Sequence, residues 1–253
     1  MSGAQQLASR ACLSAGAGLV TAAVPKSLWA IFVKKALAEV MCLELPETPR
    51  GTVARGAYSK LMSFIRERRI QCVVIGPGLS HERPTAALVR DLVKNITVPV
   101  VLDADGLNAF KGKSSRLKDH GAGLILTPHP REFERLFSMR TPEGKKEKIF
   151  LLKKLSKTLD VTLVLKGHRT LVVHKNGSYE NRTGNPGMAK GGAGDVLTGV
   201  IAAFIAQGLD PFKAACWGVY FHGKAGDLAL KSKGPLALLA GDIIEYLPRA
   251  FKK

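Results

Sequence analysis

The residues best suited to chemistry lie in one glycine-rich segment (residues 184–195), which reads Gly-Asn-Pro-Gly-Met-Ala-Lys-Gly-Gly-Ala-Gly-Asp. Glycines let a backbone turn tightly and bring its N–H groups close to a ligand. The run 195–206 that follows predicts a helix, whose first N–H groups are unpaired and lie at the positive end of its dipole. The glycine-rich segment therefore predicts a site for an anion, such as a phosphoryl group in transfer.

Asp195 ends this segment at the expected start of the helix. One interpretation is a plain helix N-cap, because Asp is a favoured capping residue. The other is a general base, since a carboxylate beside an anion site is placed to take a proton from an attacking hydroxyl. The residue type and position leave both interpretations open.

Two familiar phosphate motifs are absent from the sequence. Walker A needs Gly-Lys-Ser/Thr, but Lys190 lies between Ala189 and Gly191. The dinucleotide fingerprint is also missing, because Gly16 and Gly18 have no third glycine at the right spacing and precede an expected strand. The glycine-rich segment is thus a phosphate loop of another kind.

The elements that must position this segment alternate between short apolar runs and longer amphipathic ones. Continuous apolar strands alternating with helices predict an α/β fold, with a mostly parallel central sheet and helices on both faces. We expect a single domain over residues 1–253. The expected strands are 18–24, 40–45, 71–75, 98–102, 123–126, 162–165 and 170–174, the last two turned at Gly167-His168, and the expected helices are 26–38, 58–69, 85–94, 145–159, 195–206 and 212–230.

Polar or glycine-rich stretches follow four of the expected strands, at 76–80, 103–108, 127–132 and 166–170. In parallel sheets ligands bind beyond the carboxyl ends of the strands, so these stretches predict an enzyme cleft.

Each polar side chain in these stretches has two interpretations. Asp103, Asp105 and Asn108 are either turn formers or, for the two carboxylates, a possible Mg²⁺ site. Lys166 is either a surface lysine or a phosphate contact, and His129, between two prolines, either caps a loop or contacts a ligand.

The bulk composition narrows the class of protein. The 38 basic and 20 acidic residues give a formal charge of +18, which attracts anions, but the basic residues are spread along the chain as a solvated basic face would be. A nucleic-acid-binding protein is the alternative that this charge supports, although no recognition helix or aromatic RNA-binding pattern accompanies it. The four cysteines are far apart, and we expect free thiols, no signal peptide, no membrane span and a cytoplasmic location.

The glycine-rich segment and the residues after it resemble the signature of the ADP/ATP-dependent NAD(P)H-hydrate dehydratases, a branch of the ribokinase-like superfamily. Further blocks match that family in order over nearly the whole chain, which makes chance agreement implausible. They are Gly16-Ala17-Gly18-Leu19-Val20-Thr21, Ile75-Gly76-Pro77-Gly78-Leu79, Asp103-Ala104-Asp105-Gly106-Leu107-Asn108, Leu126-Thr127-Pro128-His129-Pro130-x-Glu132-Phe133 and Lys166-Gly167.

The resemblance implies repair of NADH or NADPH whose nicotinamide ring has been hydrated. A nucleotide, with ADP preferred over ATP, phosphorylates the ring hydroxyl in the presence of Mg²⁺, and phosphate then leaves. It also implies a homo-oligomer, with the tetramer as the common assembly of the family. By resemblance, Asp195 is the base, with Gly192, Ala193 and Gly194 around the phosphoryl group; Ala4, Gly78, His129, Glu132 and Asp195 bind the hydrate; and Lys166, Gly167, His168, Arg169, Thr170, Asn185, Gly191 and Gly194 bind the nucleotide.

The sequence departs from the family pattern in two places. Residues Ser2-Gly3-Ala4 resemble the middle of the family's first glycine loop, so we expect the sheet to lack the strand that precedes this loop. Lys190 stands where the family usually has a small hydroxyl residue, and could add a phosphate contact or obstruct the loop. The alternatives are a vitamin-precursor or sugar kinase of the same superfamily and an inactive truncated homologue.

Overall fold

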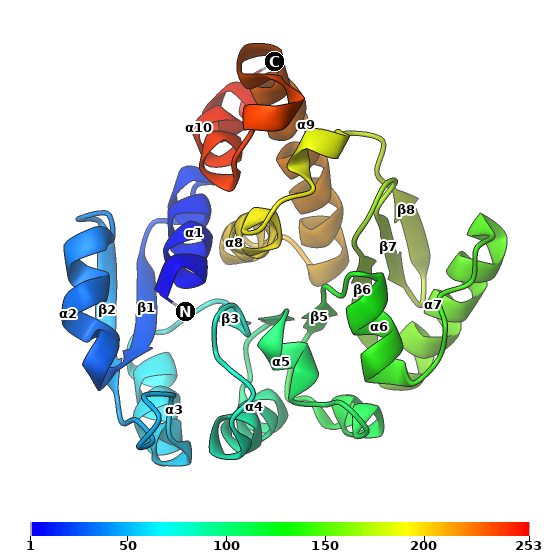
Figure 1. Cartoon of the computed structure of the whole chain (residues 1–253). Helices are drawn as coiled ribbons and strands as arrows, with labels where there is room; N and C mark the ends of the chain where they lie inside the picture. Colours follow the sequence, from blue (N-terminus) through cyan, green and yellow to red (C-terminus); the bar gives the residue numbers. More distant parts are fainter. Residues whose placement is uncertain (1, 253) are drawn as a thin grey trace.

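The computed structural model describes residues 2–252 and has helices on both faces of a six-stranded sheet (Figure 1). The strand order is β3-β4-β5-β6-β7-β8, in which β3 to β6 are parallel neighbours and β7 and β8 are antiparallel. The expected pair of strands turned at Gly167-His168 is confirmed as the β6–β7 pair. The strands are β3 (Val73–Ile75), β4 (Val100–Leu102), β5 (Leu124–Leu126), β6 (Val161–Leu165), β7 (Leu171–His174) and β8 (Gly177–Glu180).

A second, smaller sheet is formed by β1 (Val20–Pro25) and β2 (Val40–Leu45), which are parallel and connected by α2 (Lys26–Lys35). Among residues 2–252 no strand joins β1 to the larger sheet, so the strands form two sheets where the strand–helix alternation predicted one.

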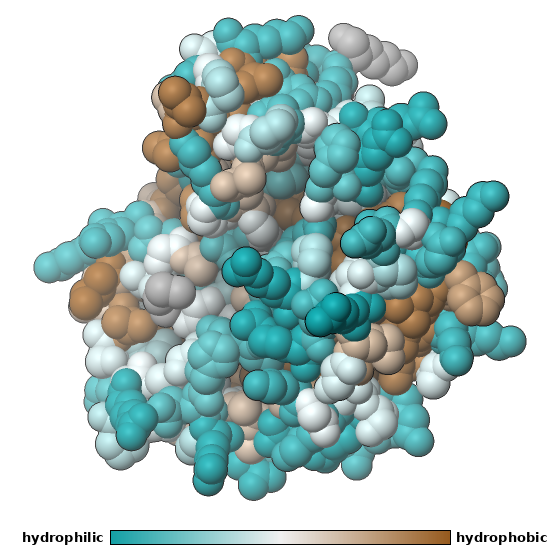
Figure 2. All heavy atoms as spheres, turned by 45° about the vertical axis from the view of Figure 1, so that its right-hand side comes forward, coloured by the Kyte–Doolittle hydropathy of each residue, from teal (hydrophilic) through white to brown (hydrophobic). Residues whose placement is uncertain are grey.

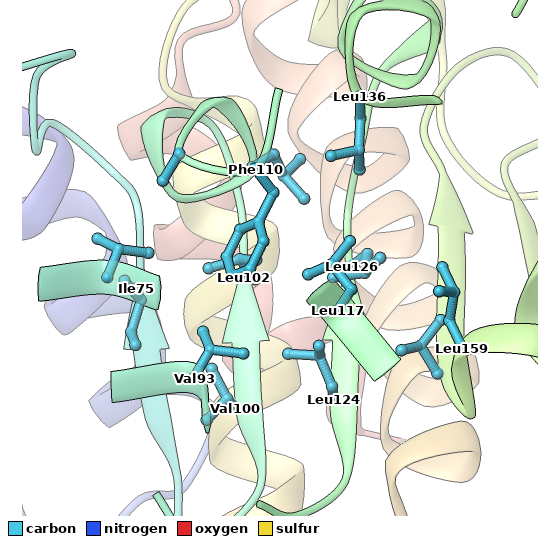
Figure 3. Close-up of a cluster of buried hydrophobic side chains, with 14 of the residues drawn as sticks. Ile75, Val93, Val100, Leu102, Phe110, Leu117, Leu124, Leu126, Leu136 and Leu159 are labelled. Carbon is cyan, nitrogen blue, oxygen red and sulfur yellow. The ribbon is translucent and has the colours of Figure 1, made fainter. Parts of the chain in front are cut away.

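The larger sheet is buried because successive side chains of each strand face opposite layers. On β4, Val100 and Leu102 pack in one hydrophobic cluster, whereas Val101 packs in another with helix α8 (Ala193–Ala206). Figure 3 shows the first cluster, in which side chains from β3, β4 and β5 meet those of the covering helices. This two-sided burial explains why the strands read as continuous apolar runs.

The remaining helices confirm most of the sequence expectations. The expected helix 145–159 is α7 with the same bounds, and α9 extends beyond its expected end at 230, with a kink at Gly234 before Pro235. The helices are α1 (Ser2–Ser14), α3 (Tyr58–Glu67), α4 (Arg83–Asn95), α5 (Asp105–Asn108), α6 (Pro130–Phe137), α7 (Lys145–Leu159), α9 (Pro211–Ala237) and α10 (Ala240–Phe251), with short 3-10 helices at Arg55–Ala57, Ser114–Asp119 and Pro186–Met188.

Four α-helices and one strand were not expected, and one of these helices is the short α5, which lies in the polar stretch 103–108. Helix α1 is rich in small and weakly polar residues, α6 begins next to two prolines, α10 contains Pro248, and β8 has no apolar run. Proline is well tolerated at the first helical position, which is where Pro130 lies.

The surface is rich in polar and charged side chains, in keeping with the 38 basic and 20 acidic residues of the sequence. Figure 2 shows a face covered mainly by hydrophilic side chains, with hydrophobic ones in small separate groups. Within residues 2–252, no helix combines the length and the apolar character that crossing a membrane requires.

Candidate active site

The four polar stretches predicted to form a cleft lie along one edge of the larger sheet. Strands β3, β4, β5 and β6 are parallel neighbours, so the residues after their carboxyl ends are brought together. The backbone N–H of Lys166 donates to the carbonyl of Pro128 at 2.9 Å, which ties two of these stretches beyond the end of the β5–β6 pairing.

A buried ion pair occupies the centre of this edge. The Lys166 ammonium lies 2.6 Å from Oδ1 of Asp103 and 3.7 Å from Oε2 of Glu132. Asp103 is 2% exposed and also accepts a hydrogen bond of 2.8 Å from the hydroxyl of Thr127. The Lys166 side chain is 17% exposed, so its interpretation as a surface lysine is wrong.

The glycine-rich segment reaches this centre through the start of α8. Gly192 is the residue before the helix and has a φ of 93°, a left-handed conformation that favours glycine. A Cβ built on Gly194 would lie 3.3 Å from the Lys166 ammonium and 3.7 Å from Asp103 Oδ2. The expected anion site at the helix start and the charged strand ends are therefore one site.

Asp195 is the third residue of α8, and Gly192 takes the N-cap position, so the interpretation of Asp195 as the N-cap is wrong. The positive φ of Gly192 starts the helix three residues before the carboxylate. The Asp195 side chain lies close enough to Asp103, Lys166 and Glu132 to feel their charges, which places it within the site.

The environment of Asp195 disfavours its charge. The pKa of the Asp195 carboxyl is raised from 3.8 to about 6. Burial is the largest cause, the negative charges of Asp103 and Glu132 add to it, and the Lys166 ammonium acts in the opposite direction. A carboxyl with a pKa near neutrality is suited to accept a proton at neutral pH. This position supports the interpretation as a general base.

His129 and Glu132 cap helix α6. The backbone N–H of His129 donates to Glu132 Oε2 at 2.8 Å, and the backbone N–H of Glu132 donates to Nδ1 of His129 at 3.4 Å. Burial lowers the pKa of His129, against the raising effect of Glu132. His129 therefore does cap a structural element, an unexpected helix, while its contact with the hydrate stays a prediction.

Asp105 lies apart from the Lys166 ion pair and has its own partners. Its Oδ2 accepts from the backbone N–H of Ser80 at 2.8 Å, and its Oδ1 lies 3.1 Å from Nε2 of His81 and accepts from Asn108 at 3.3 Å. The carboxylate thus ties the stretch after β3 to the stretch after β4.

The predicted nucleotide contacts after Lys166 form the turn between β6 and β7. Thr170 closes this turn, because its hydroxyl donates to the Gly167 carbonyl at 2.9 Å. Gly167, His168 and Arg169 are exposed, as nucleotide binding from solvent requires.

The other predicted site residues lie on elements around the glycine-rich segment. Ala4 is one turn before Leu7 on α1, and a Cβ on Gly192 would come within 2.6 Å of Leu7 Cδ1. Gly78 follows β3 with a φ of 73°. Lys190 donates from its ammonium to the carbonyl of Leu236, in the last turn of α9 after the kink at Gly234.

Sequence reasoning missed Thr127 as a partner of Asp103, and it missed the α9 residues that contact the glycine-rich segment. His222, Gly223, Gly226 and Asp227 recur along one face of α9, a spacing that predicts a contact surface. This helical spacing is visible in the sequence, but it does not indicate which residues the surface contacts or what function it has.

Comparisons with known proteins show which family the whole chain is similar to. The model of the family described as NAD(P)H-hydrate dehydratase matches residues 1–249. The Bifunctional NAD(P)H-hydrate repair enzyme Nnr of Moorella thermoacetica is 44% identical over 250 residues, which are 98% of this chain and 46% of that protein. The chain thus spans about half the length of the bifunctional relatives that it matches.

A shorter relative is covered more fully. The ADP-dependent (S)-NAD(P)H-hydrate dehydratase of Neisseria meningitidis is 36% identical over 248 residues, which are 96% of this chain and 78% of that protein. The crystal structure of the ADP/ATP-dependent NAD(P)H-hydrate dehydratase from Bacillus subtilis, co-crystallised with ATP and Mg²⁺ and soaked with CoA, has a TM-score of 0.81 and 29% identity, with 99% of this chain and 87% of that one covered. The chain therefore has the ribokinase-like α/β fold and belongs to the NAD(P)H-hydrate dehydratase family.

Proposed function

We propose that the chain dehydrates hydrated NADH or NADPH by phosphorylating the ring hydroxyl, with ADP as the preferred donor, and then releasing phosphate. The observation that carries this proposal is Asp195, a carboxyl with a pKa of about 6 in the first turn of α8, within the field of Lys166, Asp103 and Glu132. Family membership supplies the substrate class.

The chemistry divides into two steps. Asp195 takes the proton of the ring hydroxyl, whose oxygen attacks the terminal phosphorus of the nucleotide. The bond from that phosphorus to the bridging oxygen breaks, and the N–H groups at the start of α8 stabilise the charge on the migrating group. Phosphate then leaves the ring carbon with the electrons of the C–O bond, while the neighbouring ring carbon loses a proton to solvent and the ring C=C bond forms. This step is favoured because phosphate is a far better leaving group than hydroxide.

Lys166 serves both the substrate and the base. Its ammonium is held between the Asp103 and Glu132 carboxylates, and Gly194 lies next to it. In this place it can pair with a phosphate oxygen, and its positive charge also lowers the pKa of Asp195.

The donor set fits a magnesium ion that arrives with the nucleotide. Mg²⁺ in phosphate-transfer sites is usually held by one or two carboxylates together with substrate phosphates. Asp103 and Glu132 are the carboxylates that face the Lys166 ammonium, so we propose them, rather than the Asp103 and Asp105 pair, as the residues that would hold the ion. Bound there, Mg²⁺ would neutralise phosphate charge.

The test of the proposed function is recovery of the absorbance of the reduced nicotinamide ring from purified hydrates, with ADP or ATP and with or without Mg²⁺. Asp195→Ala removes the base, and Asp119→Ala, an exposed aspartate away from the site, is the matched control. We expect recovery in the parent and in Asp119→Ala, faster with ADP, and none in Asp195→Ala. A stable phosphorylated product without ring recovery would instead favour the kinase alternative, and no turnover would favour the inactive homologue.

We also propose a homo-oligomer. The small sheet and its helix expose several large apolar side chains, which an interface between copies would bury. Sedimentation at several concentrations tests this, with Trp29→Lys expected to lower the mass. The side chains are Leu19, Trp29, Ile31, Val33, Leu37 and Met41.

We also propose a cytoplasmic location. Cys12, Cys42, Cys72 and Cys216 are all free thiols, as is usual in a reducing compartment. Fractionation of cells that produce the tagged chain is the measurement.

A further inference from the structure

One face of helix α9 lies along the glycine-rich segment and contacts its beginning, middle and end. Gly226 faces Met188 so closely that a Cβ there would lie 2.2 Å from the Met188 sulfur. His222 is next to the backbone of Ala193, at the start of α8. Asp227, one position after Gly226, binds the beginning of the segment.

Asp227 binds two adjacent residues of the segment. Its Oδ2 accepts from the backbone N–H of Gly184 at 2.8 Å, and its Oδ1 accepts from the side-chain amide of Asn185 at 2.9 Å. The Oδ1 of Asn185 in turn accepts from the backbone N–H of Gly187 at 3.1 Å. A single carboxylate therefore holds the backbone of Gly184 directly and that of Gly187 through the side chain of Asn185, in one chain of hydrogen bonds.

The residues just before the segment are held on the same helix. The Thr183 hydroxyl donates to the carbonyl of Tyr220 at 2.8 Å. The side-chain amide of Asn181 donates to the carbonyl of Val219 at 3.0 Å. Gly223 makes this approach possible, because a Cβ there would lie 2.2 Å from the Thr183 hydroxyl oxygen. Asn181, Thr183 and Asn185 thus alternate along the chain and direct their polar groups toward α9.

His222 completes the contact at the far end of the segment. Burial lowers its pKa to about 4, so the ring is neutral at physiological pH, and its Nε2 is buried without a hydrogen-bond partner among residues 2–252. Helix α9 therefore holds the beginning of the segment through the Asp227 carboxylate and its end through the polar contact of His222 with the backbone of Ala193.

We propose that Asp227 is a positioning residue for phosphoryl transfer, which acts by fixing Gly184 and Asn185 so that the rest of the glycine-rich segment directs its N–H groups at the migrating group. The proposal rests on the proposed function for the reaction, and it adds a residue that touches neither substrate nor nucleotide. It also assigns the amide of Asn185 to holding the segment, where the family resemblance implied a nucleotide contact.

The geometry allows a test by exchange of the two partners. Asp227→Asn alone replaces one of two accepting oxygens by an NH₂ donor, which then faces either the Gly184 N–H or the Asn185 amide, another donor. Asn185→Asp alone places two carboxylates opposite each other, and neither can donate. The double variant Asn185→Asp/Asp227→Asn can keep every bond with the polarity reversed, because the new amide accepts from Gly184 and donates to the new carboxylate, which still accepts from Gly187.

The readouts are kcat and KM for hydrate and nucleotide, together with the unfolding temperature. We expect each single variant to lose about 10- to 100-fold in kcat with little change in KM for the hydrate, because misaligned N–H donors weaken transition-state stabilisation. The double variant should recover most of kcat. A role confined to stability would lower the unfolding temperature and leave kcat of the folded enzyme unchanged.

Two results would overturn the proposal: a single Asp227→Asn variant with parental kcat, or a double variant that folds and stays as inactive as the single ones. A double variant that fails to fold would also count against it, since the same bonds should form. If the parent turns over no hydrate, the proposed function fails. The positioning role of Asp227 is then tested by calorimetry of Mg²⁺-ADP binding, where the single variants should lose affinity and the double variant should regain it.

Discussion

Replacing Asp195 by Asn should abolish activity and at the same time stabilise the protein. The substitution keeps the size of the side chain and removes the charge that the site disfavours. Because the folded pKa of Asp195 is raised from 3.8 to about 6, the folded protein binds this proton more tightly than the unfolded chain does. Its ionisation therefore reduces the free energy of unfolding as the pH rises through 4 to 6.

The size of the effect follows from the shift. A rise from 3.8 to about 6 corresponds to about 3 kcal/mol at full burial. Asp195 is only half-buried, and solvent screening reduces the figure to about 1–2 kcal/mol. Asp195→Asn should gain this stability at pH 7 to 8. The gain should shrink as the pH falls from 6 toward 4, and it should vanish only below 3.8, where the aspartate is neutral in both the folded and the unfolded state.

Urea unfolding of parent and variant at pH 4.5, 6 and 8 measures the difference, and Asp119→Asn controls for removal of an exposed charge. A pH-independent difference, or a variant less stable than the parent at pH 8, would refute the reasoning that the site holds this carboxylate at a cost in stability. Loss of about 10²- to 10⁴-fold in kcat, the usual contribution of a general base, should accompany the gain.

Further predictions concern the neighbours of Asp195. The kcat/KM of the parent should rise with pH through about 6, since Asp195 accepts the proton only when ionised, and a pH profile measures it. Lys166→Met should destabilise the protein by about 3–5 kcal/mol in urea unfolding, because it leaves the buried Asp103 carboxylate without its ion-pair partner. The same variant should move the rise of kcat/KM with pH to higher pH, because the positive charge of Lys166 lowers the pKa of Asp195. Gly223→Ala should cost about 1–3 kcal/mol through its clash with Thr183, whereas Gly241→Ala, with nothing within 4 Å, should be neutral or stabilising in the same assay.

The sequence predicts the layered architecture well because apolar continuity reports burial on both faces of a strand. The bounds of α7 and the antiparallel β6–β7 pair followed from local pattern and a Gly-His turn. Helix α6 did not, because its N-terminus is formed by the reciprocal His129–Glu132 cap, and two flanking prolines read as a loop. Separation of β1–β2 from the larger sheet depends on pairing between distant strands, which no local pattern encodes.

The same limit applied to the site. The glycine-rich segment and Asp195 could be identified from residue type, yet their interpretation depended on where the helix begins. Only the positive φ of Gly192 settles that Asp195 lies in the first turn rather than at the cap. The partners of the segment on α9 lie about 40 residues away along the chain, so Asp227 could be connected to Gly184 only through the fold.

The charge of the chain and the charge of its site have opposite signs, and the difference bears on how a nucleotide is bound. The chain carries +18, yet Asp103, Glu132 and Asp195 surround a single ammonium, that of Lys166. An anionic phosphate would meet a net negative centre there, so the overall field can steer the nucleotide toward the protein but cannot hold its phosphates in place. Helix N–H groups and a divalent cation are what can do so, and for that reason activity should depend more steeply on Mg²⁺ than on ionic strength.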